Sequence, residues 1–127
     1  MIKLYDYILS GSCYKVRLML NILNVEYEAV PVDFYPGLEH KKPDFLALNP
    51  LGQLPVLTDD ELILRDAQSI LLYLVSKYDA ANTWFPEDAA TRGQVAMWTA
   101  FGGDEIMAAS AARLHDVLNY PFDIDQQ

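Results

Sequence analysis

Residues 49–57 read NPLGQLPVL, and the proline at position 55 is the feature of this stretch that decides the fold. The run from Leu54 to Leu57 has the apolar character of a short β-strand. Proline has no N–H to donate to a neighbouring strand, so within a sheet it is tolerated only at an edge, at a strand start or at a bulge. Pro50 and Gly52, just upstream, are typical of a turn. The question is therefore which of these places Pro55 occupies.

The segments on both sides of this stretch alternate between the periodicities of strands and helices. Residues 2–8 alternate as a strand does, and residues 16–23 repeat apolar side chains at helical spacing. A second alternating stretch follows at residues 25–30, and a weak helical pattern at residues 43–48. Residues 56–64 are typical of two short strands about a tight turn, and residues 67–78 of a strong helix capped by Asp66. The order β-α-β-α-β-β-α predicts an α/β domain whose helices cover a mixed sheet, with the last two strands antiparallel.

The chain changes character after this pattern. Residues 1–79 are predicted to form the α/β domain, and residues 80–88 (AANTWFPED) read as a linker because they contain Pro86 and show no periodicity. From there to about Leu118 the sequence is Ala-rich and helical, with a kink at Gly102–Gly103. Residues 89–127 are therefore expected to be the start of an all-α domain, within which the chain stops partway.

Composition excludes several classes of function. The 127 residues are 52% hydrophobic, which is typical of a globular chain, and the net charge of -9 argues against nucleic acid or an anionic membrane as a partner. No apolar run is long enough to span a membrane, and no targeting signal is visible, so a cytoplasmic protein is expected. Cys13 is the only cysteine, and His40 and His115 fall in no ligand spacing, so we expect no metal site.

The position of Pro55 resembles that of the proline in thioredoxin-like domains. In that fold the proline begins the third strand and is usually cis, so that the N–H and C=O of the residue before it, here Leu54, face outward and pair with a bound peptide. The alternative is a trans proline that merely starts an edge strand.

Three motifs extend this resemblance to a family. LSGSCYKVRLML (residues 9–20), EHKKPDFLALNPLGQLPVL (39–57) and LILRDAQSILLYLVSKY (62–78) resemble, in order and spacing, the N-terminal domain of cytosolic glutathione S-transferases. The likeness covers residues 2–80 and is greatest to the serine-type theta, delta and zeta classes and their bacterial relatives. The helix after the linker resembles the start of the second, all-helical domain of that family.

The resemblance implies a catalytic serine. In the serine-type enzymes a serine at the place of Ser10 donates a hydrogen bond to the glutathione sulfur and stabilises its thiolate. The alternatives are that Ser10 only caps the following helix, that Ser12 has the catalytic role, or that Cys13 is the nucleophile of a glutathione-dependent thiol reductase. We expect Cys13 to be structural instead, and Tyr7 to pack in the core or in an interface.

The resemblance also implies the binding residues for glutathione. Asp66 and Ala67 stand where the family has an acidic residue and a serine that hold the γ-glutamyl end, so Ala67 lacks the usual hydroxyl. His40 or Lys41 would bind the glycyl carboxylate. Gln53, Leu54 and Pro55 would lie beside the cysteinyl backbone. By contrast, Trp84, Trp98 and His115 are interpreted as helix-packing residues.

The sequence thus predicts a glutathione transferase that attaches the glutathione thiolate to a small electrophile. Glutathione is its co-substrate, and family members usually form homodimers. A non-catalytic interaction module with the same fold is the main alternative, because Ala67 departs from the family pattern.

Overall fold

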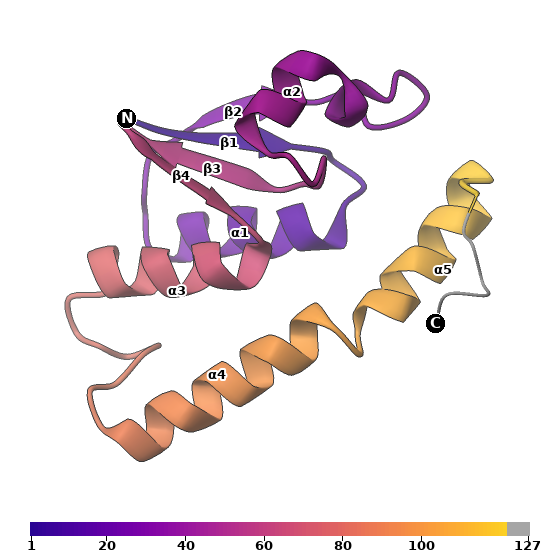
Figure 1. Ribbon diagram of the computed structural model, residues 1–127. Coiled ribbons are helices and arrows are strands. Elements are labelled where there is room, and N and C mark those ends of the chain that lie inside the picture. Colours follow the sequence, from indigo (N-terminus) through magenta and orange to yellow (C-terminus); the bar gives the residue numbers. More distant parts are fainter. Residues whose placement is uncertain (122–127) are drawn as a thin grey trace.

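The computed structural model describes residues 1–121, which form a layered α/β domain followed by two further helices (Figure 1). The elements are β1 (Ile2–Asp6), α1 (Gly11–Ile22), β2 (Glu28–Pro31), a short 3₁₀ helix η1 (Glu39–Lys41), α2 (Pro43–Leu48), β3 (Val56–Asp59), β4 (Leu62–Arg65), α3 (Ala67–Tyr78), α4 (Ala89–Gly103) and α5 (Met107–Leu118). Helices α1 and α3 lie on one face of the sheet and α2 on the other (Figure 1). This is the predicted thioredoxin-like arrangement.

The four strands form one mixed sheet in the order β2-β1-β3-β4. β1 pairs in parallel with β2, while β3 is antiparallel to both β1 and β4. The first residue of β3 is Val56, which lies opposite Tyr5 of β1 and Arg65 of β4. Pro55 therefore lies immediately before a central strand and outside its ladder, and the Leu54–Pro55 peptide bond is cis, as predicted.

The core lies between the sheet and the helices α1 and α3. Its completely buried side chains come from all these elements: Leu4, Val16, Leu20, Leu57, Ile70 and Leu74. A smaller cluster of Val32, Phe45 and Val56 anchors α2 to the other face. Burying a large apolar side chain contributes about 1.5–3 kcal/mol, so these two clusters hold α1 and α3 on one face of the sheet and α2 on the other.

Helices α4 and α5 depart from the predicted single helix in one respect. The predicted kink at Gly102–Gly103 is a break, with α4 ending at Gly103 and α5 beginning at Met107.

Neither helix contains a buried residue, and Trp98 is 65% and Trp84 46% exposed, so the prediction that these tryptophans are packing residues is wrong. No helix within residues 1–121 has the length and apolar character needed to cross a membrane.

Candidate functional site

A cleft of about 400 Å³ opens where the loops of the thioredoxin-like domain face α5. Its walls come from the loops after β1, before β3 and before α3, from η1, and from α5. All the predicted site residues but one line it, namely Ser10, Ser12, His40, Lys41, Gln53, Leu54, Pro55, Asp66 and Ala67. The exception is Cys13. The roles of these residues stay predictions, but the fold brings them to one place.

Ser10 lies at the N-cap of α1, at the cleft end of the first βα loop. Its Oγ accepts a hydrogen bond from the backbone N–H of Cys13 (3.2 Å), and its own N–H donates to the carbonyl of Tyr7 (2.9 Å). The loop is held from the other side by Arg17, whose guanidinium pairs with Asp6 and donates to the carbonyl of Ile8 (3.2 Å). The cap uses a lone pair of Oγ and leaves its O–H as a donor, so capping and a catalytic role are compatible.

Cys13 lies on the buried face of α1, away from the cleft. It is completely buried, and burial raises the pKa of its thiol to about 11, an effect that hydrogen bonding from Ser10 and from the backbone offsets only in part. A protonated, inaccessible thiol is a poor nucleophile. The structural role expected for Cys13 agrees with this position.

The loop before Pro55 is held by side chains that point away from the cleft. The buried amide of Asn49 donates to the carbonyl of Gln53 (2.9 Å) and accepts from the N–H of Leu51 (3.1 Å). Gly52 has φ +57°, and a Cβ there would lie 2.7 Å from the carbonyl oxygen of His40. Only glycine fits this close approach, which presses the loop against η1.

Asp66 and Ala67 form the N-terminus of α3 at the cleft. Oδ1 of Asp66 accepts from the N–H groups of Gln68 (2.8 Å) and Ser69 (3.2 Å), so Asp66 is the predicted N-cap. Ala67 is 3% exposed and presents no side-chain donor to the cleft. A helix N-terminus favours an anionic group because its first N–H groups have no intrahelical partner.

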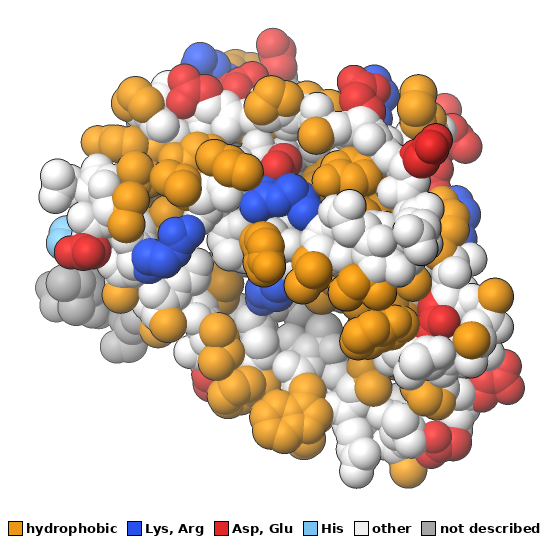
Figure 2. All heavy atoms as spheres, turned by 180° about the vertical axis from the view of Figure 1, so that it is seen from behind, with side chains coloured by type: hydrophobic (Ala, Val, Ile, Leu, Met, Phe, Trp, Pro, Cys, Tyr) orange, Lys and Arg blue, Asp and Glu red, His pale blue; other side chains and the backbone are white. Residues whose placement is uncertain are grey.

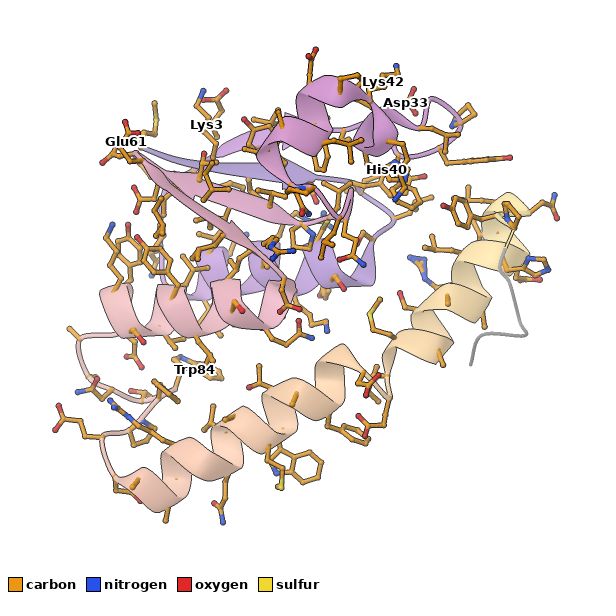
Figure 3. All side chains as sticks on the ribbon, in the orientation of Figure 1. Lys3, Asp33, His40, Lys42, Glu61 and Trp84 are labelled. Atoms are coloured by element: carbon orange, nitrogen blue, oxygen red, sulfur yellow. The ribbon has the colours of Figure 1, made fainter. Side chains whose placement is uncertain are left out.

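His40 lies on the side of the sheet that faces the C-terminal end of α5 (Figure 3). Its ring stacks on Phe34 with the centroids 4.1 Å apart, and Phe34 in turn stacks on Tyr120 at 5.3 Å. Burial and the nearby charge of Lys41 lower the pKa of His40, so the ring is neutral at pH 7. Its Nδ1 is buried and has no hydrogen-bond partner among the described residues.

The structure adds cleft residues that the sequence did not indicate. Tyr7, expected to pack in the core or an interface, packs against Phe34 and also lines the cleft, which the sequence did not indicate. Gln68 follows the predicted pair Asp66–Ala67 directly and could have been included on that ground. The far wall consists of Met107, Ser110, Ala111, Leu114 and Tyr120. No motif marks these residues, because their place depends on the direction of α5 after the break.

Comparisons with known proteins agree with this arrangement. The family model for the N-terminal domain of glutathione S-transferases matches residues 4–82. Glutathione S-transferase 3 of Zea mays is 39% identical over 97 residues, which are 76% of this chain and 43% of the relative. The structure of glutathione transferase E6 of Drosophila melanogaster superposes with a TM-score of 0.85 at 31% identity, over 94% of this chain and 54% of that one.

A third likeness is to the structure of human glutathione transferase theta-2 in complex with glutathione and an unknown ligand. It superposes with a TM-score of 0.81 at 30% identity, over 91% of this chain and 47% of that one. The chain thus spans about half, or less, of the length of these relatives.

The mixed four-stranded sheet and the proline that precedes its strand β3 define the class of the fold, a thioredoxin-like domain. The family model matches more than half of the chain. The chain belongs to the glutathione S-transferase family.

Proposed function

We propose that this chain binds glutathione in the cleft and, as a glutathione transferase, joins its thiolate to a small electrophile. The observation that carries the proposal is the convergence of Ser10, Leu54–Pro55 and Asp66 on one cleft. These residues come from three loops that are distant in the sequence, and each offers a polar group suited to a different part of a tripeptide.

The binding roles follow from the groups at each wall. The backbone of Leu54, which lies outside the strand ladder, would pair with the cysteinyl backbone of glutathione, as an added strand would. Asp66 and the N-terminus of α3 would hold the γ-glutamyl ammonium and carboxylate. Lys41, which lines the cleft, or His40 beside it would take the glycyl carboxylate.

The chemistry would be carried by Ser10. Its O–H would donate to the glutathione sulfur, which stabilises thiolate over thiol and so lowers the pKa of the bound thiol. The N-terminus of α1 acts in the same direction because of its partial positive charge. The thiolate then attacks the electrophile held against the wall formed by α5, and the electrophile's leaving group or double bond accepts the electron pair.

The test is a comparison of Ser10→Ala with Ser10→Thr and Ser12→Ala. Losing one hydrogen bond to a charged sulfur costs roughly 1.5–3 kcal/mol, so Ser10→Ala should raise the pKa of the bound glutathione thiol by about 1 to 2 and slow conjugation by about tenfold or more. Ser10→Thr, which keeps both the cap and the hydroxyl, should retain activity, as should Ser12→Ala. Equal conjugation rates for wild type and Ser10→Ala would end the assignment.

The two alternative functions give different results with the wild-type chain. An interaction module would show no retention on immobilised glutathione and no lowered pKa of the glutathione thiol. A reductase would lose its activity in Cys13→Ser, but the buried position of Cys13 argues against a reductase function. We also propose that the chain forms the homodimer typical of the family.

A further inference from the structure

Two polar side chains of the thioredoxin-like domain contact the C-terminal end of α4. The ammonium of Lys15, on α1, donates to the carbonyl of Gly102 (2.8 Å). The amide oxygen of Gln68, on α3, accepts from the N–H of Gly103 (2.8 Å), while its amide nitrogen donates to Oδ1 of Asp66 (2.9 Å). These contacts join two consecutive residues of α4 to two different helices under the sheet.

The contact of Lys15 suits the end of a helix. The last carbonyls of a helix lack intrahelical partners and lie at the negative end of its dipole, where an ammonium is favourable. Lys15 is half-buried in a second recess, between α4 and the helices α1 and α3. The face shown in Figure 2 has hydrophobic side chains along the depression between the two lobes of the molecule.

Gly103 is the residue that lets Gln68 lie against α4. A Cβ at position 103 would come within 2.5 Å of the end of the Gln68 side-chain amide, whereas a Cβ at position 102 meets nothing within 4 Å. The clash at 103 involves the end of a flexible side chain, so an alanine there displaces the amide without preventing folding. Position 102 is its matched control.

The direction of α5 is set just beyond these contacts. Three residues separate Gly103 from Met107, and α5 has no side-chain N-cap bond and no buried residue of its own. Along its length it is tied to the other domain by Ser12 to Sδ of Met107 (3.5 Å) and by Arg113 to the carbonyl of Leu9 (2.6 Å). The start of α5 is therefore held by Ser12 on one side and, through the three-residue break, by the end of α4 on the other.

We propose that Lys15 and Gln68 are positioning residues, which hold the end of α4 at Gly102–Gly103 and thereby place α5 as the far wall of the cleft. The consequence for catalysis rests on the proposed function. The consequence for the structure does not, because it concerns only the stability of the contact between α5 and the thioredoxin-like domain.

Hydrogen–deuterium exchange tests the structural part on four variants: Gln68→Ala, Gly103→Ala, Gly102→Ala and the double variant Gln68→Ala/Gly103→Ala. Loss of the Gln68 contact should make the α5 amides exchange about five- to tenfold faster in the first two, with unchanged exchange in β1 and β3. Gly102→Ala should exchange in α5 no faster than wild type. The double variant should be no faster than Gln68→Ala alone, because the clash is then gone. Equal α5 exchange in Gly103→Ala, Gln68→Ala and wild type would overturn the proposal.

Kinetics with glutathione and 1-chloro-2,4-dinitrobenzene test the functional part on Lys15→Met and Lys15→Arg. Lys15→Met should raise KM for the electrophile about fivefold and change KM for glutathione less, because only the α5 wall is displaced. Lys15→Arg, which keeps a cationic donor, should restore the wild-type value. If wild type shows no turnover, the proposed function fails, while α5 exchange in Lys15→Met still decides the positioning role: exchange as slow as in wild type would contradict it.

Discussion

Ala67 is the residue at which the cleft departs from the pattern that the family resemblance implies. It is the first residue of α3, directly beside the Asp66 cap, and it lines the cleft. Ala67→Ser should add a hydroxyl that donates to the γ-glutamyl carboxylate. A hydrogen bond to a charged group contributes roughly 1.5–3 kcal/mol, so the Kd for glutathione should fall by about tenfold or more.

Calorimetric titration of wild type, Ala67→Ser and the control Ser69→Ala measures this effect. Ser69 lies two residues further along α3, and its hydroxyl is not expected to bind the carboxylate, so Ser69→Ala should bind as wild type does. Unchanged affinity in Ala67→Ser would show that the α3 N-terminus does not contact the glutathione carboxylate.

Cys13 gives a second prediction at the scale of a single residue. Because burial raises its thiol pKa to about 11, the thiol stays largely protonated at pH 8. Ellman's reagent at pH 8 should therefore label the native chain slowly, and label the urea-unfolded chain at the rate of a free cysteine. Fast labelling of the native chain, at the unfolded rate, would contradict the buried position and revive the reductase alternative.

At the scale of single residues, the sequence predicted those positions that depend on the backbone of their immediate neighbours in the chain. Ser10 and Asp66 were expected as N-caps because each precedes a helix, and their roles in the site came from the family resemblance. Pro55 was identified because proline is restricted to a few places in a sheet. Leu114 and Tyr120 reach the same cleft from residues over a hundred positions away in the chain from Ser10. No local pattern encodes such a contact, since it depends on the angle at which α5 leaves the break after Gly103.

At the scale of elements, the periodic patterns predicted which segments are helices and strands better than where they end. The second strand was expected from residue 25, but Val25 and Tyr27 pack against the core before β2 begins at Glu28. A segment whose side chains alternate between buried and exposed looks like a strand in the sequence, even where its backbone makes no hydrogen bonds to a neighbouring strand. The break between α4 and α5 was expected only as a kink, because two glycines permit either and tertiary contacts decide.

One polar contact between elements has a measurable pH dependence. Asp59, at the end of β3, accepts hydrogen bonds from Lys77 and from Tyr73 (2.6 Å) on α3. The hydrogen bond from Lys77, and to a smaller extent the one from Tyr73, lowers the pKa of Asp59 below its ordinary 3.8. The unfolded state therefore binds a proton at higher pH than the folded state, so this contact stabilises the fold above about pH 4 and the stabilisation is lost as the pH falls through the lowered pKa.

Urea unfolding at pH 6 and pH 3 tests this contact in wild type and Asp59→Asn. The free energy of unfolding should fall between these pH values more steeply in wild type than in Asp59→Asn, which has no carboxylate to protonate. Asp60→Asn is the matched control, because Asp60 is largely exposed and pairs only with the terminal ammonium among the described residues. An identical fall in wild type and Asp59→Asn would show that the Asp59 contact contributes nothing.

At the scale of the whole molecule, two sets among the exposed apolar side chains are candidates for an interface, one on the thioredoxin-like domain and one on the helices after it. Leu62 and Ile63 (38% and 50% exposed) lie on the edge strand β4, and Met97, Trp98 and Phe101 (56%, 65% and 40%) lie on α4. Exposed edge strands and apolar patches are typical of interfaces. In a two-fold symmetric dimer, the β4 edge of one copy can cover α4 of the other, and the reverse, as in the domain arrangement implied by the family resemblance.

The proposed homodimer is therefore expected to depend on both sets. In sedimentation velocity, wild type should run at twice its 14.4 kDa chain mass, whereas Ile63→Lys and Trp98→Glu should each shift it toward the single-chain mass, because either variant places a charge in both halves of a symmetric interface. Leu18→Lys is the control, since Leu18 is 46% exposed on α1, outside both sets. A dimer that survives both variants would place the interface elsewhere, and a wild-type monomer at every concentration would rule out the homodimer. Glutathione binding measured on the same samples separates the two questions, because the cleft is built within one chain and should bind glutathione in monomer and dimer alike.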